Sequence, residues 1–300
     1  MLKWYKDIER DQRLIDYVET YVERLLETQA TNGSFPAWVH MQTGEHSPYL
    51  AESPETSMHV WLLTKMYEVT NESQYLEAAL KGIKFVIHEI IPTGRWEDFE
   101  TYWSCSRQWD GKQYGVKDAR SGLYNQCNFS IYWTIEALQL LYTITKESVY
   151  LQKGEQLLAE LSLYQAVWEP EYVTVPVLGG FGVMNSDDEW NDARQSLFAC
   201  TYFNYYRITG KEEYKYRGIW AMRAAFYMMY CPENQVMKKI YEDKFHYFSE
   251  LDYGFEMENA HHGANGSYTD IEPGEFTIFD WGNGSAAAAL GELMLVTGDK

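Results

Sequence analysis

Cysteine, basic residues and long apolar runs are all scarce in this sequence of 300 residues. Its four cysteines show no Cys-x-x-Cys spacing, so we interpret them as buried free thiols, which leaves the redox compartment open. They are Cys105, Cys127, Cys200 and Cys231. Lysine and arginine number 25 against 44 aspartates and glutamates, a net charge of −19. Because phosphate binding needs a basic face, we expect no nucleic-acid partner and no binding to an anionic membrane surface.

No apolar run is long enough to span a bilayer, and Met1–Lys6 is not a signal peptide. The chain as it stands is therefore expected to be cytoplasmic, or secreted or periplasmic if a leader is missing. No His-x-x-x-His or comparable spacing predicts a metal, and we expect no cofactor. The sequence indicates no particular oligomeric state.

A repeated motif dominates what is present. Tyr-x-x-Thr-x-x-x-x-Tyr occurs three times between apolar, helix-patterned runs, and a fourth copy begins at Met294 and is cut short. The three copies are Tyr67/Thr70/Tyr75, Tyr142/Thr145/Tyr150 and Tyr206/Thr209/Tyr214. The turns inside them are too short for anything but an antiparallel helical hairpin. The repeat therefore predicts an array of hairpins.

Helical periodicity predicts a first helix over residues 10–29, three hairpins and a last helix. The hairpin helices are expected at 54–69 and 75–89, 128–144 and 148–165, and 190–208 and 212–230, and the last helix at 283–297. The first helix of each hairpin is apolar nearly all round and the second is amphipathic, so buried inner helices alternate with outer ones. This pattern predicts an all-α fold, an α/α toroid. Ser53 is the expected N-cap of the first hairpin.

We expect residues 1–300 to form a single toroid domain that is truncated at its C-terminus, inside the fourth hairpin. Long loops over 92–127, 166–189 and 231–282 precede the inner helices, so they should gather at one mouth of the ring. Short strands are expected within them at 173–177 and 275–279. Apolar surface should be exposed near Val296, because the outer partner of the last helix is absent from the sequence.

The run Ser57–Thr70, followed by Tyr75–Gly82, resembles the α/α-toroid carbohydrate-active enzymes. These include six-hairpin glycosidases, unsaturated glucuronyl hydrolases and toroid pectate lyases. Gln29–Trp38 is similar to the Gln-x-x-Asn-Gly-Gly-Trp-Pro turn of the toroid lyases, and also to the Gln-Trp turns of terpene cyclases. The resemblance covers most of the chain and implies a carbohydrate substrate without selecting a reaction. A full six-hairpin ring needs more helices than this sequence contains, which fits a truncated chain or a smaller ring.

Residues 179–194 carry glycines, acids, Trp190 and Arg194 at the start of an inner helix. Carboxyl groups that lie close together shift each other's pKa values apart, so that one can act as an acid and another as a base. Asp188 and Asp192 are the first candidates for these roles, and Glu189 is the next. The structural alternative is a capping box formed by Ser186 and Glu189.

Two further segments carry candidate chemistry. In the first, His261 and His262 follow Asn259, a set that suits proton abstraction or a metal, and the alternative is that these are solvated loop residues. Adjacent residues of a strand point to opposite sides, so at most one histidine should face the cleft. In the second, Asp280 beside Trp281 resembles an acid against a sugar platform, and the alternative is a helix cap.

The loop 95–110 contains three tryptophans, which form either a small satellite core or stacking platforms for sugar rings. Basic residues near them would meet a uronate carboxylate, and a tyrosine follows. The candidates for substrate binding in this region are Trp96, Trp103, Trp109, Arg107, Arg120 and Tyr124.

These features favour a carbohydrate-active enzyme that cleaves a polysaccharide or oligosaccharide. As a hydrolase, one carboxylic acid would protonate the glycosidic oxygen while a second activates water. As a lyase, a His or Tyr would abstract the proton next to a uronate carboxylate. Asp188 or Asp192 should then lie within about 10 Å of Asp280 or His261.

Two other classes remain open. A non-catalytic glycan-binding toroid needs aromatics but no paired acids. A terpene-cyclase-like toroid requires Asp-x-Asp-Asp, whereas residues 185–188 read Asn-Ser-Asp-Asp.

Overall fold

The computed structural model describes residues 1–40, 42–102, 114–186, 189–260 and 281–297. These residues fold into helices and connecting loops, and isolated bridges are the only strand-type pairing among them. The chain divides into two compact units, Met1–Ser104 with Trp109–Leu157, and Leu158–Lys300 with Cys105–Gln108. We call them unit 1 and unit 2 and describe each by itself. No helix in the described part of the chain is both long and apolar enough to cross a membrane.

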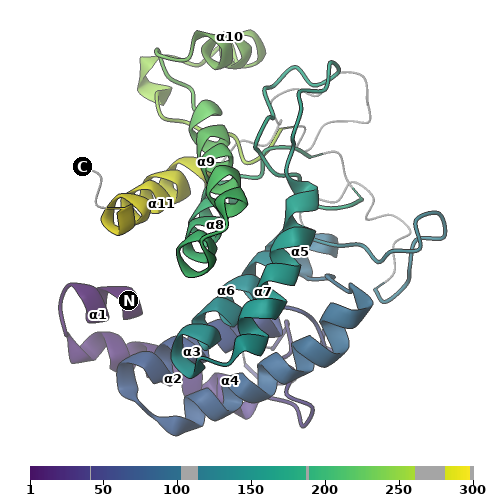
Figure 1. The fold of residues 1–300 in the computed structure, drawn as a ribbon, viewed down its shortest axis with the longest axis vertical. Coiled ribbons are helices and arrows are strands. Elements are labelled where there is room, and N and C mark those ends of the chain that lie inside the picture. Colours follow the sequence, from purple (N-terminus) through teal and green to yellow (C-terminus); the bar gives the residue numbers. More distant parts are fainter. Residues whose placement is uncertain (41, 103–113, 187–188, 261–280, 298–300) are drawn as a thin grey trace. The chain divides into compact units, whose positions relative to one another are not determined.

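Unit 1 contains the first two predicted hairpins, α3–α4 and α6–α7 (Figure 1). Its helices are α1 Leu2–Asp7, α2 Gln12–Glu27, α3 Thr56–Thr70, α4 Ser73–Phe85, α5 Phe99–Tyr102, α6 Asn128–Thr145 and most of α7 Ser148–Leu161, which crosses into unit 2 after Leu157. A π-turn at Val86–Ile90 and a 3₁₀ turn at Ile91–Thr93 extend α4, and a 3₁₀ turn at Ser162–Tyr164 extends α7.

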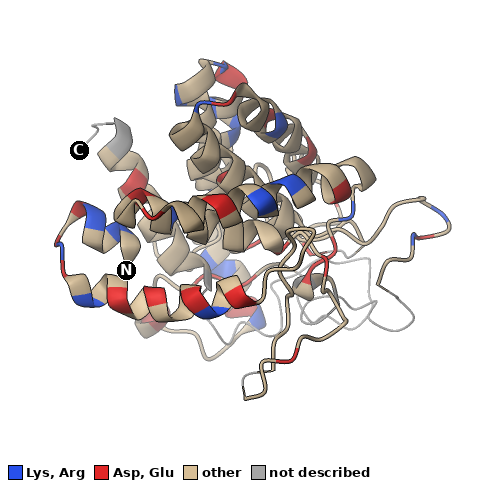
Figure 2. Ribbon diagram, turned by 90° about the horizontal axis from the view of Figure 1, so that it is seen from below, with Lys and Arg blue, Asp and Glu red and all other residues tan. Residues whose placement is uncertain are grey.

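Unit 2 contains the third hairpin, α8 Gln195–Thr209 and α9 Glu212–Tyr227, which lie side by side (Figure 1). α11 Trp281–Thr297 packs against both helices of this hairpin. α10 Gln235–Lys244 and a 3₁₀ turn at Glu250–Asp252 lie in what the sequence predicted to be a loop. Along the helices, basic residues are interspersed with acidic ones (Figure 2).

The repeated motif is a helix stop. In its first copy, Asn71 adopts a left-handed conformation with φ 63° and donates its N–H to the Tyr67 carbonyl at 2.8 Å. The Thr70 hydroxyl donates to Met66 O at 2.8 Å and accepts the N–H of Glu72 at 3.2 Å. Both interactions satisfy backbone groups that the end of a helix leaves without partners. The same bonds recur around Thr145 with Lys146 and around Thr209 with Gly210.

Glycines allow the outer helices to approach the inner ones closely. A Cβ added at Gly82 of α4 would lie 2.7 Å from Val60 Cγ2 of α3. A Cβ at Gly218 of α9 would lie 2.8 Å from the Phe203 ring of α8. The outer helices α4 and α9 therefore each have a glycine where they cross their inner partners, a feature that helical periodicity alone does not reveal.

The prediction of buried inner helices is confirmed for α3, α6 and α8, each of which buries most of one broad apolar surface. It is wrong for the C-terminal half of α11, where Leu290 and Met294 are exposed and Leu295 is 85% exposed. This exposure agrees with the apolar surface expected near the last helix.

Three local predictions are wrong. α8 begins at Gln195 instead of residue 190, because Asn191 has a positive φ of 56° and the Asp192 side chain accepts the Arg194 N–H, which holds 189–194 in an irregular turn. α3 is capped at Glu55, and Ser53 makes no cap hydrogen bond. Residues 173–177 form no strand, and 275–279 lie outside the described residues.

The side chains of residues 173–177 nevertheless alternate between buried and less buried positions, as they would in a strand. Val173, Val175 and Val177 are buried, and they pack in one cluster with Met237 and Tyr241 of α10. The predicted alternation therefore reflects burial against a helix instead of pairing with a strand. Among the described cysteines, Cys127 is buried as expected, whereas Cys200 and Cys231 are only partly buried. Cys105 lies outside the described residues.

Candidate active site

Many of the predicted site residues fall outside the described part of the chain. Asp188, Asp280, His261, His262, Trp103, Arg107 and Trp109 are in this group. Their roles therefore stay predictions. Asp192 is the described member of the predicted catalytic set, and its neighbours on both sides can be examined.

Asp192 forms a bidentate ion pair. It is 2% exposed, and Arg194 donates from Nε to Oδ1 and from Nη2 to Oδ2, both at 2.8 Å. Its own N–H bonds to Phe181 O at 2.9 Å. The capping-box alternative for Glu189 is wrong, because α8 begins only at Gln195 and Glu189 is a buried residue of the preceding turn. Two buried acids thus lie just before α8.

The predicted segments 179–194 and 256–260 lie together in unit 2. Trp190 and Ala260 exchange two backbone hydrogen bonds, 3.1 Å and 2.7 Å long, and Ala193 N donates to Glu258 O at 2.7 Å. Residues 190–193 and 258–260 are therefore in contact, and the convergence of the whole segments 179–194 and 256–285 on one cleft stays a prediction. The third predicted segment, 92–127, lies largely in unit 1, so its convergence with them stays a prediction.

A third buried acid in unit 2 lies against the first turn of α11. A Cβ added at Gly282 would lie 2.3 Å from Glu256 Cδ, so the carboxyl group of Glu256 packs directly on the helix backbone. Carboxylates at helix N-termini are stabilised by the backbone dipoles. Asn259 is also buried, and its Oδ1 has no hydrogen-bond partner in the described part of the chain. Glu189, Asp192 and Glu256 therefore place three acids at the N-terminal ends of α8 and α11.

Unit 1 contains an acid cluster that the sequence analysis did not select. Glu55, Glu97 and Asp98 are all buried, with Glu97 at 0% exposure. Glu55 is the N-cap residue of α3, and the other two precede α5. Buried acids are rare unless they are paired or hydrogen-bonded. The available signal was two consecutive acids, Glu97-Asp98, inside an apolar segment.

Each acid of this cluster is fixed by donors. Arg95 Nε pairs with Glu97 Oε2 at 2.9 Å, and Gly115 N lies 3.0 Å from both Glu97 carboxylate oxygens. Asp98 Oδ1 accepts two bonds of 3.1 Å from Thr101, and Oδ2 accepts one from the Ser130 hydroxyl on α6.

Glu55 joins the other two acids through the backbone of α5. Its Oε1 accepts the Phe99 N–H at 3.2 Å, and its Oε2 accepts a bond of 3.3 Å from the Ser53 hydroxyl. The cluster consequently connects the first turns of α3 and α6.

Tyr49 lies within the electrostatic reach of all three acids. Burial is the main cause that raises the pKa of Tyr49 to about 12, and the nearby charges of Glu97, Glu55 and Asp98, together with Tyr114, contribute to this rise. The Tyr49 and Tyr114 rings are 5.7 Å apart, and Arg95 stacks 4.1 Å above the Tyr114 ring. The Tyr49 phenol therefore stays protonated at neutral pH, and its O–H is available as a hydrogen-bond donor near the carboxylates.

His59, on the first turns of α3, is a neutral imidazole. Its ring lies 5.1 Å from Phe35, and burial lowers the pKa of His59 to about 4. Burial disfavours the charged form of a histidine. The imidazole of His59 therefore stays unprotonated at neutral pH.

The predicted aromatic platforms differ in how far they are exposed. Trp96 is fully buried, which assigns its ring to the core of unit 1. Trp190 packs against the buried cluster that contains Val177 and Tyr241. The backbone of Trp281 begins α11. Trp38, which was not selected, is 38% exposed, and its ring meets that of Phe99 edge-on at 6.5 Å, beside the acid cluster.

The remaining predicted groups lie at the surface of unit 1. Arg120 is exposed, and its N–H bonds to the Asp118 carboxylate at 3.1 Å. Tyr124 is half-buried beneath Lys117, whose Nζ lies 5.0 Å from the ring centre. In the described part of the chain, no three His, Cys, Asp or Glu side chains are grouped so as to hold a metal ion.

No family model matches this chain, and no curated protein matches it. Solved structures do. The GH76A α-1,6-mannanase from Salegentibacter sp. HEL1_6 superimposes with a TM-score of 0.61 at 14% identity, covering 95% of this chain and 65% of the mannanase. This chain thus spans less than two thirds of the mannanase's length.

Two other solved structures are similar. An unsaturated glucuronyl hydrolase specific for heparin gives a TM-score of 0.59 at 12% identity, covering 99% of this chain and 74% of that one. A D-mannose isomerase gives 0.57 at 14% identity, covering 94% and 67%. The chain therefore has the α/α-toroid fold of the six-hairpin glycosidase-like proteins, as its sequence predicted. By their names, these three similar structures are carbohydrate-processing enzymes.

Proposed function

We propose that this chain is a carbohydrate-active enzyme that cleaves a glycosidic bond by acid–base catalysis with buried carboxyl groups. The observation that carries the proposal is the concentration of buried acids before the inner helices. Glu55, Glu97 and Asp98 lie at the N-terminal ends of α3 and α6. In unit 2, Glu189 and Asp192 precede α8, and Glu256 lies against α11.

Glycoside hydrolysis requires two such carboxyl groups. One protonates the leaving oxygen, and the other activates water or attacks the sugar. We assign this pair in unit 1 to Glu55 and Asp98, which are joined through the backbone of α5. Glu97, fixed by Arg95, is a positioning residue. Trp38 supplies an exposed aromatic face beside them for a pyranose ring.

The residues first predicted from the sequence supply the rival assignment. Asp188, Asp192 and Asp280 are its acids, with His261 and His262 as bases for an elimination reaction. In a solved mannanase variant described as inactive, two consecutive aspartates are replaced by asparagine, and the protein is in complex with α-1,6-mannotriose. This chain contains one pair of consecutive aspartates, Asp187-Asp188, and the consecutive acids Glu97-Asp98 are both buried. The proposal therefore has two testable carboxyl pairs.

The test is a panel of neutral and uronate-containing glycans with three readouts. New reducing ends alone indicate hydrolysis, and reducing ends with the ultraviolet absorbance of an unsaturated uronate indicate elimination. Interconversion of free hexoses, followed by NMR, would indicate the isomerase chemistry named for one similar structure. Binding without any turnover would contradict the proposal and favour a non-catalytic glycan-binding toroid.

Paired variants then locate the site. Glu97→Gln/Asp98→Asn and Asp187→Asn/Asp188→Asn each preserve shape and remove charge. Loss of a working general acid or base should slow turnover by about 100- to 10,000-fold. If only the second pair lowers activity, the unit 1 assignment is wrong.

A further inference from the structure

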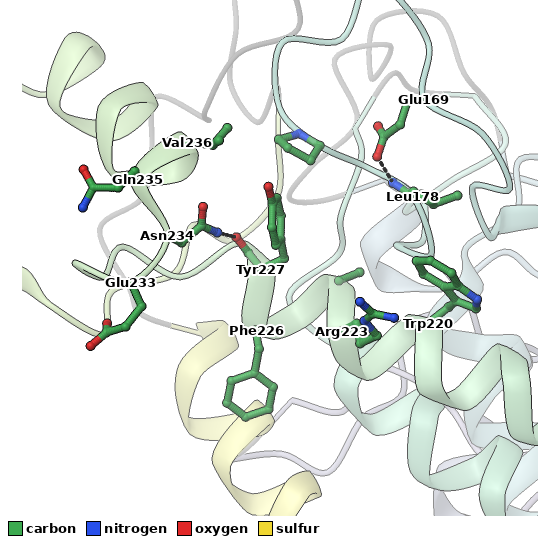
Figure 3. Close-up of a pocket in the computed structure, with 12 residues that line it drawn as sticks. Glu169, Leu178, Trp220, Arg223, Phe226, Tyr227, Glu233, Asn234, Gln235 and Val236 are labelled. Atoms are coloured by element: carbon green, nitrogen blue, oxygen red, sulfur yellow. Dashed lines mark hydrogen bonds between the residues drawn. The ribbon is translucent and has the colours of Figure 1, made fainter.

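A pocket of about 720 Å³ lies in unit 2, and none of the acids assigned above lines it. Its walls come from α9, from the loop 169–178 and from the start of α10 (Figure 3). Three side chains of α9, Trp220, Arg223 and Tyr227, line it. Their spacing of three and four residues places them on one face of the helix.

The walls of this pocket are fixed by contacts on both sides. The Glu169 carboxylate accepts the N–H groups of Val177 at 2.9 Å and Leu178 at 3.0 Å. Asn234 Nδ2 donates to Tyr227 O at 2.8 Å, which ties the start of α10 to the end of α9. The pocket is thus held in shape without a ligand.

The loop wall of the pocket is also held by a close approach between the backbone at Gly179 and the backbone of α9. Gly179 has φ +88°, and a Cβ there would lie 2.6 Å from Trp220 O. The loop 169–178 is therefore anchored directly to α9 where Trp220 enters the pocket.

Large aromatic surface is left exposed in this pocket. Trp220 is 39% exposed and Tyr227 is 43% exposed. The Arg223 guanidinium carbon lies 4.9 Å from the centre of the Trp220 ring. Flat rings beside a pocket are the usual platforms for pyranose faces, whose C–H groups pack on them.

Arg223 differs from the other cations of its helix. Lys215 pairs with Glu212 and Arg217 with Glu213, whereas Arg223 has no ion pair or hydrogen bond to a described residue. Figure 3 shows the Glu233 side chain directed away from Arg223. In a chain of net charge −19, an unneutralised guanidinium inside an aromatic pocket is suited to a planar anion.

We propose that this pocket is a second, non-catalytic carbohydrate site that binds a uronate-containing oligosaccharide. Arg223 holds a sugar carboxylate through two parallel N–H···O bonds, while Trp220 and Tyr227 stack on the rings at either side. The site anchors an acidic polysaccharide along the surface of unit 2. It requires no catalysis, so its test does not depend on the proposed reaction.

Calorimetry and NMR titration with two matched trisaccharides test this. Trigalacturonate carries the carboxylates, and α-1,4-galactotriose has the same linkage without them. The chain should bind trigalacturonate, and Arg223→Gln should weaken that binding by about 10- to 100-fold, the usual effect of losing a charge-assisted hydrogen-bonded pair. Trp220→Ala should weaken binding of both sugars.

Lys239→Gln serves as the charge control, because Lys239 is an exposed α10 cation paired with Asp243. It should leave binding unchanged. The proposal is overturned if the intact chain does not bind trigalacturonate, if galactotriose binds equally well, or if Arg223→Gln and Lys239→Gln have the same effect. Arg223 is exposed, so its substitution should leave the thermal unfolding temperature unaltered, which keeps the test independent of folding.

Discussion

In mild acid this chain should lose stability, and replacing His59 by phenylalanine should make that loss much smaller. The His59 ring lies against Phe35, and burial lowers its pKa from 6.5 to about 4. The native state therefore keeps the imidazole neutral where the unfolded chain binds a proton. Stability from this group is fully present above about pH 6.5 and is lost as the pH falls toward 4.

The magnitude follows from the width of that window. A difference of about 2.5 pKa units corresponds to about 3 kcal/mol at most, since each unit is worth about 1.4 kcal/mol. Near pH 5 the window is only partly crossed, and the loss should be about 2 kcal/mol. His59→Phe keeps an aromatic ring against Phe35 and cannot titrate, so it should not show this part of the loss.

The measurement is urea unfolding of the intact chain, His59→Phe and a His88→Gln control near pH 7 and near pH 5. His88 is exposed, so its variant should lose stability in parallel with the intact chain. NMR of the imidazole protons gives the pKa directly. If the His59 ring titrates near its ordinary value, or if His59→Phe loses as much stability as the control, the argument from burial is refuted.

Three other perturbations have defined outcomes. Asp98→Asn should lower turnover on an identified glycan by about 100- to 10,000-fold, with circular dichroism unchanged, and near-full activity would remove Asp98 from the site. Gly33→Ala should destabilise by several kcal/mol more than Gly44→Ala in urea unfolding. Both glycines have positive φ, but a Cβ at Gly33 would lie 2.3 Å from Lys81 O, whereas a Cβ at Gly44 would meet nothing within 4 Å. Equal losses of unfolding free energy in the two variants would show that the contact at Gly33 relaxes freely. Thr145→Val should cost about 1 kcal/mol, the net value of the hydrogen bonds its hydroxyl makes at the end of α6, and an unchanged unfolding midpoint would contradict this account of the motif.

The sequence by itself determined the three hairpins and the C-terminal ends of their inner helices. Apolar spacing and the Tyr-x-x-Thr stop act between residues three and four apart, so both can be read along the chain. The hydrogen bonds at Thr70, Thr145 and Thr209 close each inner helix within one or two residues of the prediction. The toroid class followed from the same alternation of buried and amphipathic helices.

Where the sequence prediction failed, the deciding contact was distant along the chain. Residues 173–177 alternate like a strand, yet they are buried against α10, whose Met237 and Tyr241 lie far along the sequence. α8 starts late because Asp192 and Asn191 take conformations set by contacts with Phe181 and Pro176. Local periodicity cannot predict such contacts, because the partner residues lie elsewhere in the sequence.

The acid cluster shows the same division. Glu97 and Asp98 are adjacent in the sequence and lie in the same loop as three tryptophans, and the tryptophans were chosen as candidate site residues instead. Only the fold brings Glu55, Ser130 and Gly115 to them, and so makes buried carboxylates tolerable there. The burial of these acids, and the hydrogen bonds that compensate for it, depend on residues that are tens of positions apart in the sequence. For that reason, only the tertiary structure decided which acids of this acidic chain are candidates for catalysis.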